Sequence, residues 1–364
     1  MTTRAVLKNA PRHPGGARNL VQDYSQNSGN GQGRTSVLMP EQASFQASTS
    51  PFPVQVQRTA LSVTYEQESY IADVVMPRVP APGERFSWKR YRPADTYRRA
   101  LNGDRVGRAS QVNRVEFGFD EVEARTEDHG LDVPIPQTDL DNANTAPGYD
   151  PIAYGIQQST NLIMLEREIR VANLAADANN YTQSVTLSSS TDKFSDYTNS
   201  HPINVISGAL RGMVRRANSM VLNEDVFDTL VRHPEIVAAY HGNEGSKGVA
   251  TLDFLKQLFR LQNIYIGAAW IDTVSQGLPT DYASTLTNLS RLWGNSISLL
   301  HIDLSANLSQ GITWGMTAQF KGRITNQRFD PNIGLEGGTI VRVGEKVREV
   351  VCAPAFGYLI ASAI

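Results

Sequence analysis

Hydrophobic and polar residues alternate along two stretches that flank a turn-rich segment between residues 83 and 135. The apolar positions are Phe86, Trp88 and Tyr91 before the turn residues and Val112, Val115, Phe117 and Phe119 after them. A period of two is typical of β-strands, because successive side chains of a strand point to opposite faces. The pattern predicts a long two-stranded hairpin with a mobile tip. A hairpin of this length is marginal on its own and needs a surface to lie on.

A helical period follows. Asp150 and Pro151 suit the cap and the first position of a helix. Apolar residues then recur at helical spacing at Ile152, Ile156, Leu162, Leu165, Ile169, Leu174 and Ala175. The spacing predicts a helix over residues 150–176, which would be about 38 Å long at ~1.5 Å per residue. Such a length suits a spine along which other layers pack.

Shorter patterns predict helices and strands in irregular alternation through the rest of the chain. Helices are expected around Ile71–Val75, from Pro202, after the capping residue Asn223 and from Thr251. Strands are expected at 220–223, 264–269, 297–302 and 312–318, with two more in 339–364. This order favours an α+β fold over a doubly wound sheet.

Charge reverses sign within the predicted hairpin. Nine basic and three acidic residues lie between Gly83 and Val115, whereas seven acidic residues and one arginine lie between Glu116 and Asp132. The candidate contact residues are Arg85, Trp88, Lys89, Arg90, Arg92, Arg98, Arg99, Arg105 and Arg108, and their acidic complement is Glu116, Asp120, Glu121, Glu123, Glu127 and Asp128. Crowding like charges on one arm has a cost that an oppositely charged surface recovers. Two interpretations stay open: a solvated surface hairpin, and an arm that docks on a neighbouring copy.

The composition is that of an ordered protein with room for a sizeable core, since 40% of the 364 residues are hydrophobic and 19% are charged. A net charge of −2 argues against dedicated nucleic-acid binding, which needs a concentrated basic face. Cys352 is the only cysteine, so neither an intrachain disulfide nor a thiolate-rich metal site is expected. The sequence shows no signal-peptide pattern and no apolar run of about 18 residues, so we expect synthesis in a reducing, intracellular compartment.

No motif for catalysis or metal binding stands out. The six histidines lack H-x-x-x-H spacing, and the chain has neither a phosphate loop nor a G-x-S-x-G elbow. Cys352 lies in the apolar run VVCAPA, which favours a packing role over a nucleophilic one. We therefore expect no cofactor, no metal and no catalytic residue. An enzyme whose site is assembled from scattered residues stays open as an alternative.

Taken in order, the elements resemble those of tailed-bacteriophage major capsid proteins with the Hong Kong 97-like fold. The likeness covers residues 50–364, and its most specific parts are residues 195–236, IYIGAAWID at 264–272, LWGNSISLLHI at 292–302 and GLEGGTIVRVGEKVREVVCAPAFGYLI at 334–360. The resemblance implies an N-terminal arm, an extended loop, a peripheral domain with a spine helix, and an axial domain. The implied bounds are 1–50 for the arm, 83–120 for the loop, 51–82 and 121–200 for the peripheral domain with its spine helix at 150–176, 203–315 for the axial domain, and 316–364 for strands that return to the peripheral domain.

The implied function is self-assembly through pentamers and hexamers into an icosahedral shell that encloses the double-stranded DNA of a tailed phage, without enzymatic activity. Implied partners are other copies of the chain, a scaffolding protein, a portal, a cement or decoration protein, and packaged DNA by weak non-specific contact, with no membrane. The implied location is the virion capsid, assembled in the host bacterial cytoplasm. Such shells expand from precursors, so hinges are expected at the hairpin base and the N-terminal arm.

Some family members crosslink a loop lysine to an asparagine of a neighbouring subunit. Lys89 is the only lysine between Lys8 and Lys193, and is therefore the only candidate for this role here. The alternative is an ordinary surface lysine. For the whole chain, the alternatives to a phage capsid protein are an encapsulin-type compartment with a protein cargo, a soluble enzyme, and another phage structural protein that forms rings or tubes.

Overall fold

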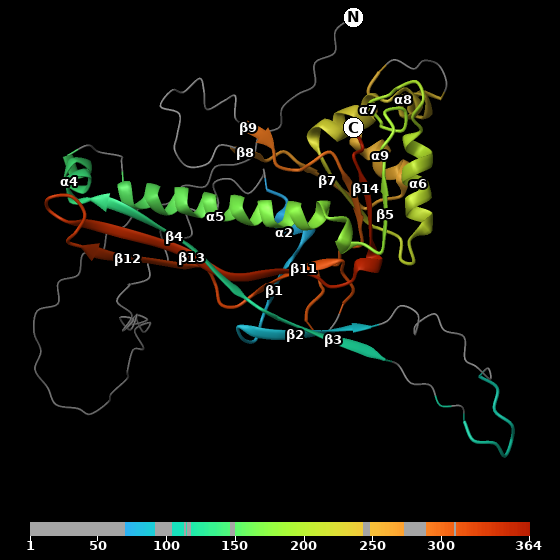
Figure 1. Ribbon diagram of the computed structural model, residues 1–364, viewed down its shortest axis with the longest axis horizontal. Coiled ribbons are helices and arrows are strands. Elements are labelled where there is room, and N and C mark those ends of the chain that lie inside the picture. The colour runs from blue at the N-terminus through green and yellow to red at the C-terminus, as the bar shows by residue number, and fades with distance from the viewer. Residues whose placement is uncertain are drawn as a thin grey trace, which may run out of the picture. The chain divides into compact units, whose positions relative to one another are not determined.

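The computed structural model describes residues 70–91, 104–112, 114, 118–145, 150–242, 248–272, 289–308 and 311–364. All of them belong to one of the two units of the chain, Ser48–Ile364. Within the described residues, strands form two five-stranded sheets and two two-stranded ribbons, and helices pack beside the sheets (Figure 1). The mixed helix-and-sheet fold expected from the sequence is confirmed. The N-terminal arm predicted at 1–50 lies outside the described residues.

The first sheet is built around β13 (Gly338–Val351). β4 (Glu127–Pro136) runs antiparallel along one edge of β13. β12 (Ile324–Asp330) and then β11 (Gly315–Gln319) pair antiparallel with the other edge. β1 (Arg78–Pro80) extends the sheet by pairing in parallel with β11. The strand expected near 312–318 and the first of the two closing strands are thereby confirmed.

Helix α5 (Pro151–Ala176) lies along this sheet, as Figure 1 shows, and confirms the predicted spine helix. Its start is fixed by Asp150, whose Oδ1 accepts the backbone N–H groups of Ile152 and Ala153 at 2.9 and 3.1 Å. The side chains of β13 alternate between two faces. Val341 and Val343 are fully buried in a cluster with residues of α5, while the intervening side chains point to the opposite face.

The buried part of α5 is wider than the predicted apolar stripe. Ser159 and Thr160 are buried, and each donates its hydroxyl to a backbone carbonyl one turn earlier, at 2.7 Å. Arg167 and Glu168 are also buried, whereas Leu162, which we assigned to the apolar face, is 51% exposed. The difference arises because α5 packs against α2 (Ala72–Val75) and the second sheet as well as against the first.

The second sheet has the order β5-β14-β10-β6-β7. Its strands are β5 (Gln183–Thr186), β14 (Gly357–Ala361), β10 (Ile297–Leu300), β6 (Ser219–Asn223) and β7 (Asn263–Gly267). Helices of this part are α6 (Pro202–Gly212), α7 (Glu224–Arg232), α8 (Pro234–His241) and α9 (Leu252–Phe259). The predicted caps are confirmed, because Asn223 accepts the N–H of Val226 at 2.7 Å and Thr251 that of Phe254 at 3.3 Å.

The two closing strands separate, which differs from the expectation that both return to the peripheral sheet. β13 joins the first sheet, but β14 pairs antiparallel with β10 and parallel with β5 in the second. The short 3₁₀ helix η2 (Pro354–Phe356) redirects the chain between them. Gly357 follows, where a Cβ would come within 2.6 Å of the Trp314 ring and 2.7 Å of the Tyr181 ring. Only glycine allows the backbone to pass these stacked rings.

The predicted hairpin is confirmed over its described part, where β2 (Arg85–Tyr91) and β3 (Phe119–Arg125) pair antiparallel. The return leg then changes partner at Thr126, whose N–H donates to the carbonyl of Glu84 at 2.9 Å. From the next residue onward the leg is β4 and pairs with β13 instead of β2. Residues 119–136 therefore form one extended leg shared by two sheets.

Further short elements complete the described part of the chain. They are α4 (Gln137–Thr145), the 3₁₀ turn η1 (Ala178–Asn180), and the two-stranded ribbon of β8 (Trp270–Asp272) and β9 (Leu289–Arg291). In the part of the chain that the structure describes, no helix combines the length and the apolar character needed to cross a membrane.

Candidate functional site

The base of the hairpin is anchored to its own subunit. Phe86 and Trp88 are 5% and 7% exposed, and their rings stack 5.9 Å apart against a cluster that includes Met316 and Val350. On the same face, Arg90 donates to the carbonyls of Cys352 and Val351 at 3.0 and 3.2 Å, at the end of β13. Two of the predicted contact residues, Trp88 and Arg90, therefore hold the hairpin to the first sheet of this subunit.

The opposite face of the hairpin base is exposed and carries a lysine and a glutamate on facing positions. Lys89 stands directly opposite Glu121 in the β2–β3 register, and its ammonium lies 4.5 Å from the centre of the Phe119 ring. Glu121 also accepts the hydroxyl of Ser87 at 2.7 Å. The structure thus places Lys89 on an accessible face. Its assignment as a crosslinking residue stays a prediction.

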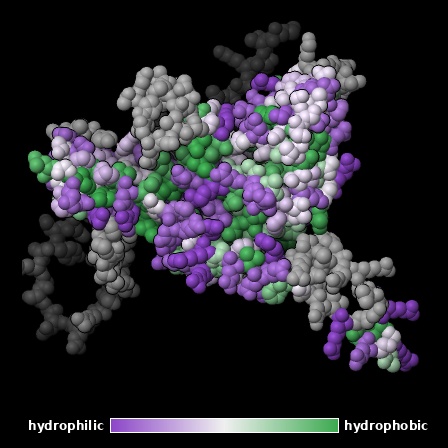
Figure 2. All heavy atoms as spheres, in the orientation of Figure 1, coloured by the Kyte–Doolittle hydropathy of each residue, from purple (hydrophilic) through white to green (hydrophobic). Residues whose placement is uncertain are grey.

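The distal arm, defined here as residues 104–112, is exposed throughout. Arg105 and Arg108 are exposed together with two valines, Val106 at 40% and Val112 at 72%. Figure 2 shows this stretch as a mainly hydrophilic surface with hydrophobic atoms among it. Exposed valines beside arginines are typical of a contact surface, which gains from apolar burial as well as from charge. Arg92, Arg98, Arg99 and Glu116 lie outside the described residues.

Part of the acidic run is neutralised within the subunit by β13, and this corrects its assignment as a complement to the basic arm alone. Glu127 pairs with Arg348, and Asp128 accepts from Lys346 at 3.0 Å. Further along, both carboxylate oxygens of Asp132 accept from Arg342, at 2.6 and 2.7 Å. The reason is the change of strand partner, which puts the later acids beside the alternating basic residues of RVGEKVRE. Asp120 and Glu123 remain on the β3 part of the leg, across from β2.

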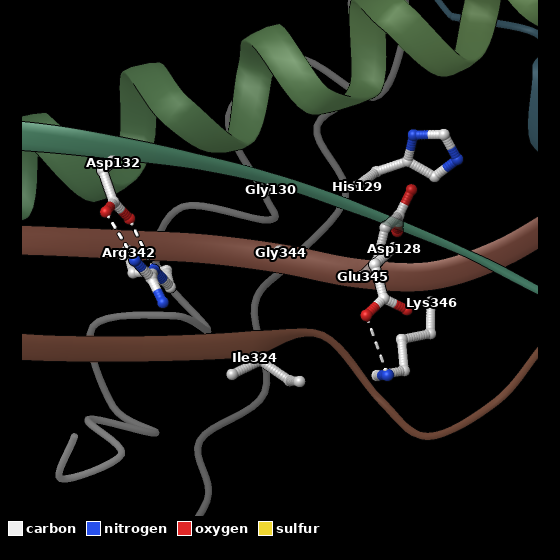
Figure 3. A pocket seen from close by; sticks show the side chains of 9 residues that line it. All are labelled: Asp128, His129, Gly130, Asp132, Ile324, Arg342, Gly344, Glu345 and Lys346. Atoms are coloured by element: carbon white, nitrogen blue, oxygen red, sulfur yellow. Dashed lines mark hydrogen bonds and ion pairs between the residues drawn. The ribbon is translucent and has the colours of Figure 1, made fainter. Parts of the chain in front are cut away.

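A hollow of about 360 Å³ lies between these ion pairs. Gly130 and Gly344 face each other in the β4–β13 register, so the floor is bare backbone. A Cβ on Gly344 would lie 2.9 Å from the carbonyl oxygen of His129, which excludes a side chain there. Figure 3 shows the two glycines between the Asp132–Arg342 pair on one side and Asp128 with Lys346 on the other. Asp128, Asp132 and Glu345 are each paired with a basic residue, so the hollow mainly offers a shape for contact.

A buried charge network supports the platform on which the hairpin base rests. Glu345 of β13 has a side-chain exposure of 0%, accepts from Arg78 of β1 at 2.8 Å and lies 3.6 Å from Arg323. Burial by itself would raise the pKa of Glu345, but Arg78, Arg323 and Arg167 together hold that pKa below its ordinary value of 4.5. Nearby, Arg170 of α5 makes two hydrogen bonds of 3.1 Å to Glu349.

This network was not predicted from the sequence. The segment LEREIR on α5 is mostly charged, which is also typical of an exposed helix face. The signal that could have identified it is the position of these charges between two mainly apolar runs of the helix, LIML before them and VANLAA after them. Charges so placed must pair, because an isolated buried charge is costly.

Reactive chemistry is not evident among the described residues. No group of three or more histidine, cysteine, aspartate or glutamate side chains in them could hold a metal ion. Burial raises the pKa of the Cys352 thiol to about 12, although Arg90 acts in the opposite direction. A thiol with so high a pKa is a poor nucleophile at neutral pH, which agrees with the packing role expected from the sequence.

The fold defines the class of protein. It is similar to a phage-related protein from Bordetella bronchiseptica RB50, with a TM-score of 0.64 and 18% identity over 86% of this chain and 98% of that one. It is also similar to the capsid protein of Cyanophage P-SCSP1u, with a TM-score of 0.51 and 11% identity over 82% and 89% of the two chains. The chain therefore has the fold of Hong Kong 97-like phage capsid proteins.

Sequence relatives then show the family. The major capsid protein of Pseudomonas phage JBD67 is 39% identical over 319 residues, which are 87% of this chain and 99% of that protein. The major capsid protein of Burkholderia phage BcepMu is 28% identical over 316 residues, 83% of this chain and 94% of that protein. No family model matches the chain. The chain belongs to the family of phage major capsid proteins, as the resemblance in the sequence suggested.

Proposed function

We propose that this major capsid protein assembles through pentamers and hexamers into an icosahedral shell that encloses the double-stranded DNA of a tailed phage. The observation that carries the proposal is the 39% identity to a phage major capsid protein along nearly its whole length. The role is structural and includes no catalytic step. The same relationship favours a phage shell over an encapsulin-type compartment.

Within this proposal, the distal arm makes the contact with a neighbouring subunit. Three observations support it: the base of the hairpin is fixed to its own subunit, part of the acidic run is neutralised by β13, and Arg105, Arg108 and the two valines beside them are exposed. A subunit contact of the usual size buries on the order of 1,000–2,000 Å². Several such contacts per subunit add up to a stable shell. The anchoring of the base by Trp88 and Arg90 argues against the hinge expected at the hairpin base.

The proposed peripheral and axial domains correspond to the two five-stranded sheets, and β14 changes from the peripheral to the axial domain. The first sheet with α5 corresponds to the peripheral domain, and the second sheet with α6 to α9 corresponds to the axial domain. β14 belongs to the second sheet by its pairing, so the return strands end at β13. The proposed partners are a scaffolding protein, a portal, a cement protein and weakly bound packaged DNA. The proposed location is the virion capsid, assembled in the host bacterial cytoplasm.

Electron microscopy of the purified protein, alone and with the products of neighbouring genes, tests the proposed function. Closed icosahedral shells, or hexamers and pentamers that close when a scaffold is added, are expected. DNA inside shells isolated from infected cells distinguishes a phage capsid from a compartment with a cargo enzyme. A monodisperse dimer or tetramer that never assembles would overturn the proposal.

Assembly is expected to depend on the arginines of the distal arm. The double substitution Arg105→Gln and Arg108→Gln should lower the yield of shells and flatten the dependence of assembly on salt, because exposed charge pairs between subunits are screened by salt. Light scattering over a range of NaCl concentrations measures both effects. The matched control, Arg211→Gln with Arg232→Gln, makes the same change of charge outside the hairpin and should assemble as the parent does. Equal salt dependence in both variants would show that the arm contact is not electrostatic.

A further inference from the structure

Two adjacent residues of α5 hold the short helix α2 at both of its ends. Glu168 accepts the backbone N–H groups of Ile71 and Ala72, at 3.0 and 2.7 Å, where α2 begins. Arg167 donates to the carbonyl of Met76 at 3.1 Å, just after α2 ends. The signs match the helix dipole, which favours an anion at the N-terminus and a cation at the C-terminus.

α2 depends on tertiary contacts for its helical state. It has four residues, and an isolated helix shorter than about 12 residues is marginal in water. Arg167 adds an ion pair to Asp73 in the first turn of α2 and a 3.0 Å hydrogen bond to Thr317 of β11. These polar contacts act together with the burial of Ala72 and Val75 in the core cluster shared with α5. We therefore expect α2 to be either docked and helical or released and unwound.

The carboxylate of Glu168 also reaches a third part of the molecule. Its Oε1 accepts the indole N–H of Trp293 at 2.8 Å, and Trp293 lies between β9 and β10. The indole ring lies against Gly267 at the end of β7, where a Cβ would come within 2.1 Å of it. The carbonyl of Trp293 accepts the side-chain amide of Asn223, the cap of α7, at 3.1 Å. Trp293 is thus fixed to the second sheet and, through Glu168, to α2.

The hydrogen bonds from α2 and from Trp293 share one buried acceptor, the Glu168 carboxylate, so a change in one bond affects the others. Glu168 is 0% exposed, and burial raises its pKa while the three N–H donors act to lower it. Release of α2 would remove two of the three donors. A buried carboxylate that loses its donors must recruit water or turn toward solvent, and either change weakens the bond to Trp293. Coupling of this kind is reciprocal, so weakening the Trp293 bond must also loosen α2.

We propose that Arg167 and Glu168 form a two-state clasp that couples the docking of α2 to the position of Trp293, and thereby to the edge of the second sheet. α2 is the first described helix of the chain, and the clasp holds both of its ends. The coupling is a property of the single subunit. Its use during shell assembly rests on the proposed function.

Hydrogen–deuterium exchange of the unassembled subunit tests the clasp. Glu168→Gln is expected to speed amide exchange about tenfold or more at residues 70–76 and also at 289–300. The reason is that the NH₂ group of glutamine is a donor and cannot accept a hydrogen bond, so at least one of the three N–H donors loses its acceptor. Trp293→Phe removes the indole N–H and keeps an aromatic ring, and it should speed exchange at 70–76 as well. The control is Glu166→Gln, which makes the same change of charge at an exposed position of α5 and should leave both segments at parent rates.

The reciprocal effect decides the outcome. If Trp293→Phe leaves residues 70–76 at parent rates, or if Glu168→Gln affects only those residues, α2 and Trp293 are not coupled and the proposal fails. Should Glu168→Gln not fold, the conservative Trp293→Phe variant gives the deciding measurement alone. Amide exchange is measured on the unassembled subunit, so it tests the clasp independently of whether the protein assembles into shells.

Discussion

Glu345→Ala is expected to destabilise the folded subunit by about 3–5 kcal/mol, the usual cost of removing one partner from a buried ion pair. The side chain of Glu345 is fully buried between Arg78 of β1 and Arg323, which precedes β12. Its removal leaves Arg323 without the carboxylate it faces and places two guanidinium groups near each other with less negative charge between them. Urea unfolding of the unassembled subunit measures the loss as a shift of the midpoint at unchanged slope.

Asp132→Ala is the matched control for this prediction. Asp132 also pairs with an arginine across the β4–β13 ladder, but the side chains of Asp132 and Arg342 are 35% and 43% exposed. An exposed pair contributes about 1 kcal/mol or less. An equal loss of stability in Glu345→Ala and Asp132→Ala would show that the buried contacts of Glu345 are no stronger than an exposed ion pair.

Acidification should narrow the difference between Glu345→Ala and the parent. The pKa of Glu345 in the folded state lies below its ordinary value of 4.5, although burial acts to raise it. A carboxylate with a lowered pKa stabilises the fold above its unfolded pKa, and this contribution is lost as pH falls through the folded pKa. The two unfolding midpoints should therefore differ most near neutrality and should converge only as pH falls below 4.5 and through the lower pKa of the folded state. A constant difference down to that range would contradict the ionised state of Glu345.

Trp88→Ala is the second change with a large expected effect, about 3–5 kcal/mol for truncating a large buried aromatic side chain. Trp88 is 7% exposed, stacks on Phe86 and fills the space between the hairpin and the first sheet. Its loss should free the hairpin base, so amide exchange in β2 and β3 should rise and the yield of shells should fall. Exchange measured on the subunit and electron microscopy of the assembly reaction follow the two effects separately.

Two further variants show whether Trp88 acts through packing. Arg85→Ala lies on the same strand but on its exposed side, opposite Arg125, and should change stability by no more than about 0.5 kcal/mol. Trp88→Phe keeps a ring and should recover part of the loss. A Trp88→Ala subunit as stable as Arg85→Ala would mean that the hairpin base is not anchored by its aromatic face.

Much of the fold could be predicted because its elements carry local signals. Asp150 with Pro151, Asn223 and Thr251 each mark a helix start, and the structure places a cap at all three. β12 was missed because ITNQRFD has no strict alternation, and its strand state depends on pairing with β13. β14 was found as a strand but expected in the wrong sheet. Its pairing with β10 and β5 joins segments far apart in the sequence, and its backbone passes beside the stacked Tyr181 and Trp314 rings at Gly357, which no local pattern encodes.

The candidate site was predicted in part. Alternation correctly identified the hairpin, but Trp88, which was expected to contact a neighbouring copy, packs with Phe86 on its own subunit. The charge pattern alone could not show which strand would meet the acids. Counting charge along the sequence treated Glu127 and Asp128 as partners of the basic arm, whereas β13 begins about 200 residues later and pairs with both. Long-range strand pairing of this kind is decided by the packing of the whole sheet.

The extended leg of residues 119–136 restricts how the gene can change in length. Side chains alternate along the leg, so inserting one residue near Thr126 would turn Asp128 and Asp132 from the face of Lys346 and Arg342 to the face of α5. Insertions between Tyr91 and Phe119 would leave both ladders in register. Natural variants of this capsid protein should therefore differ in length within the arm while keeping the number of residues from Phe119 to Pro136 constant.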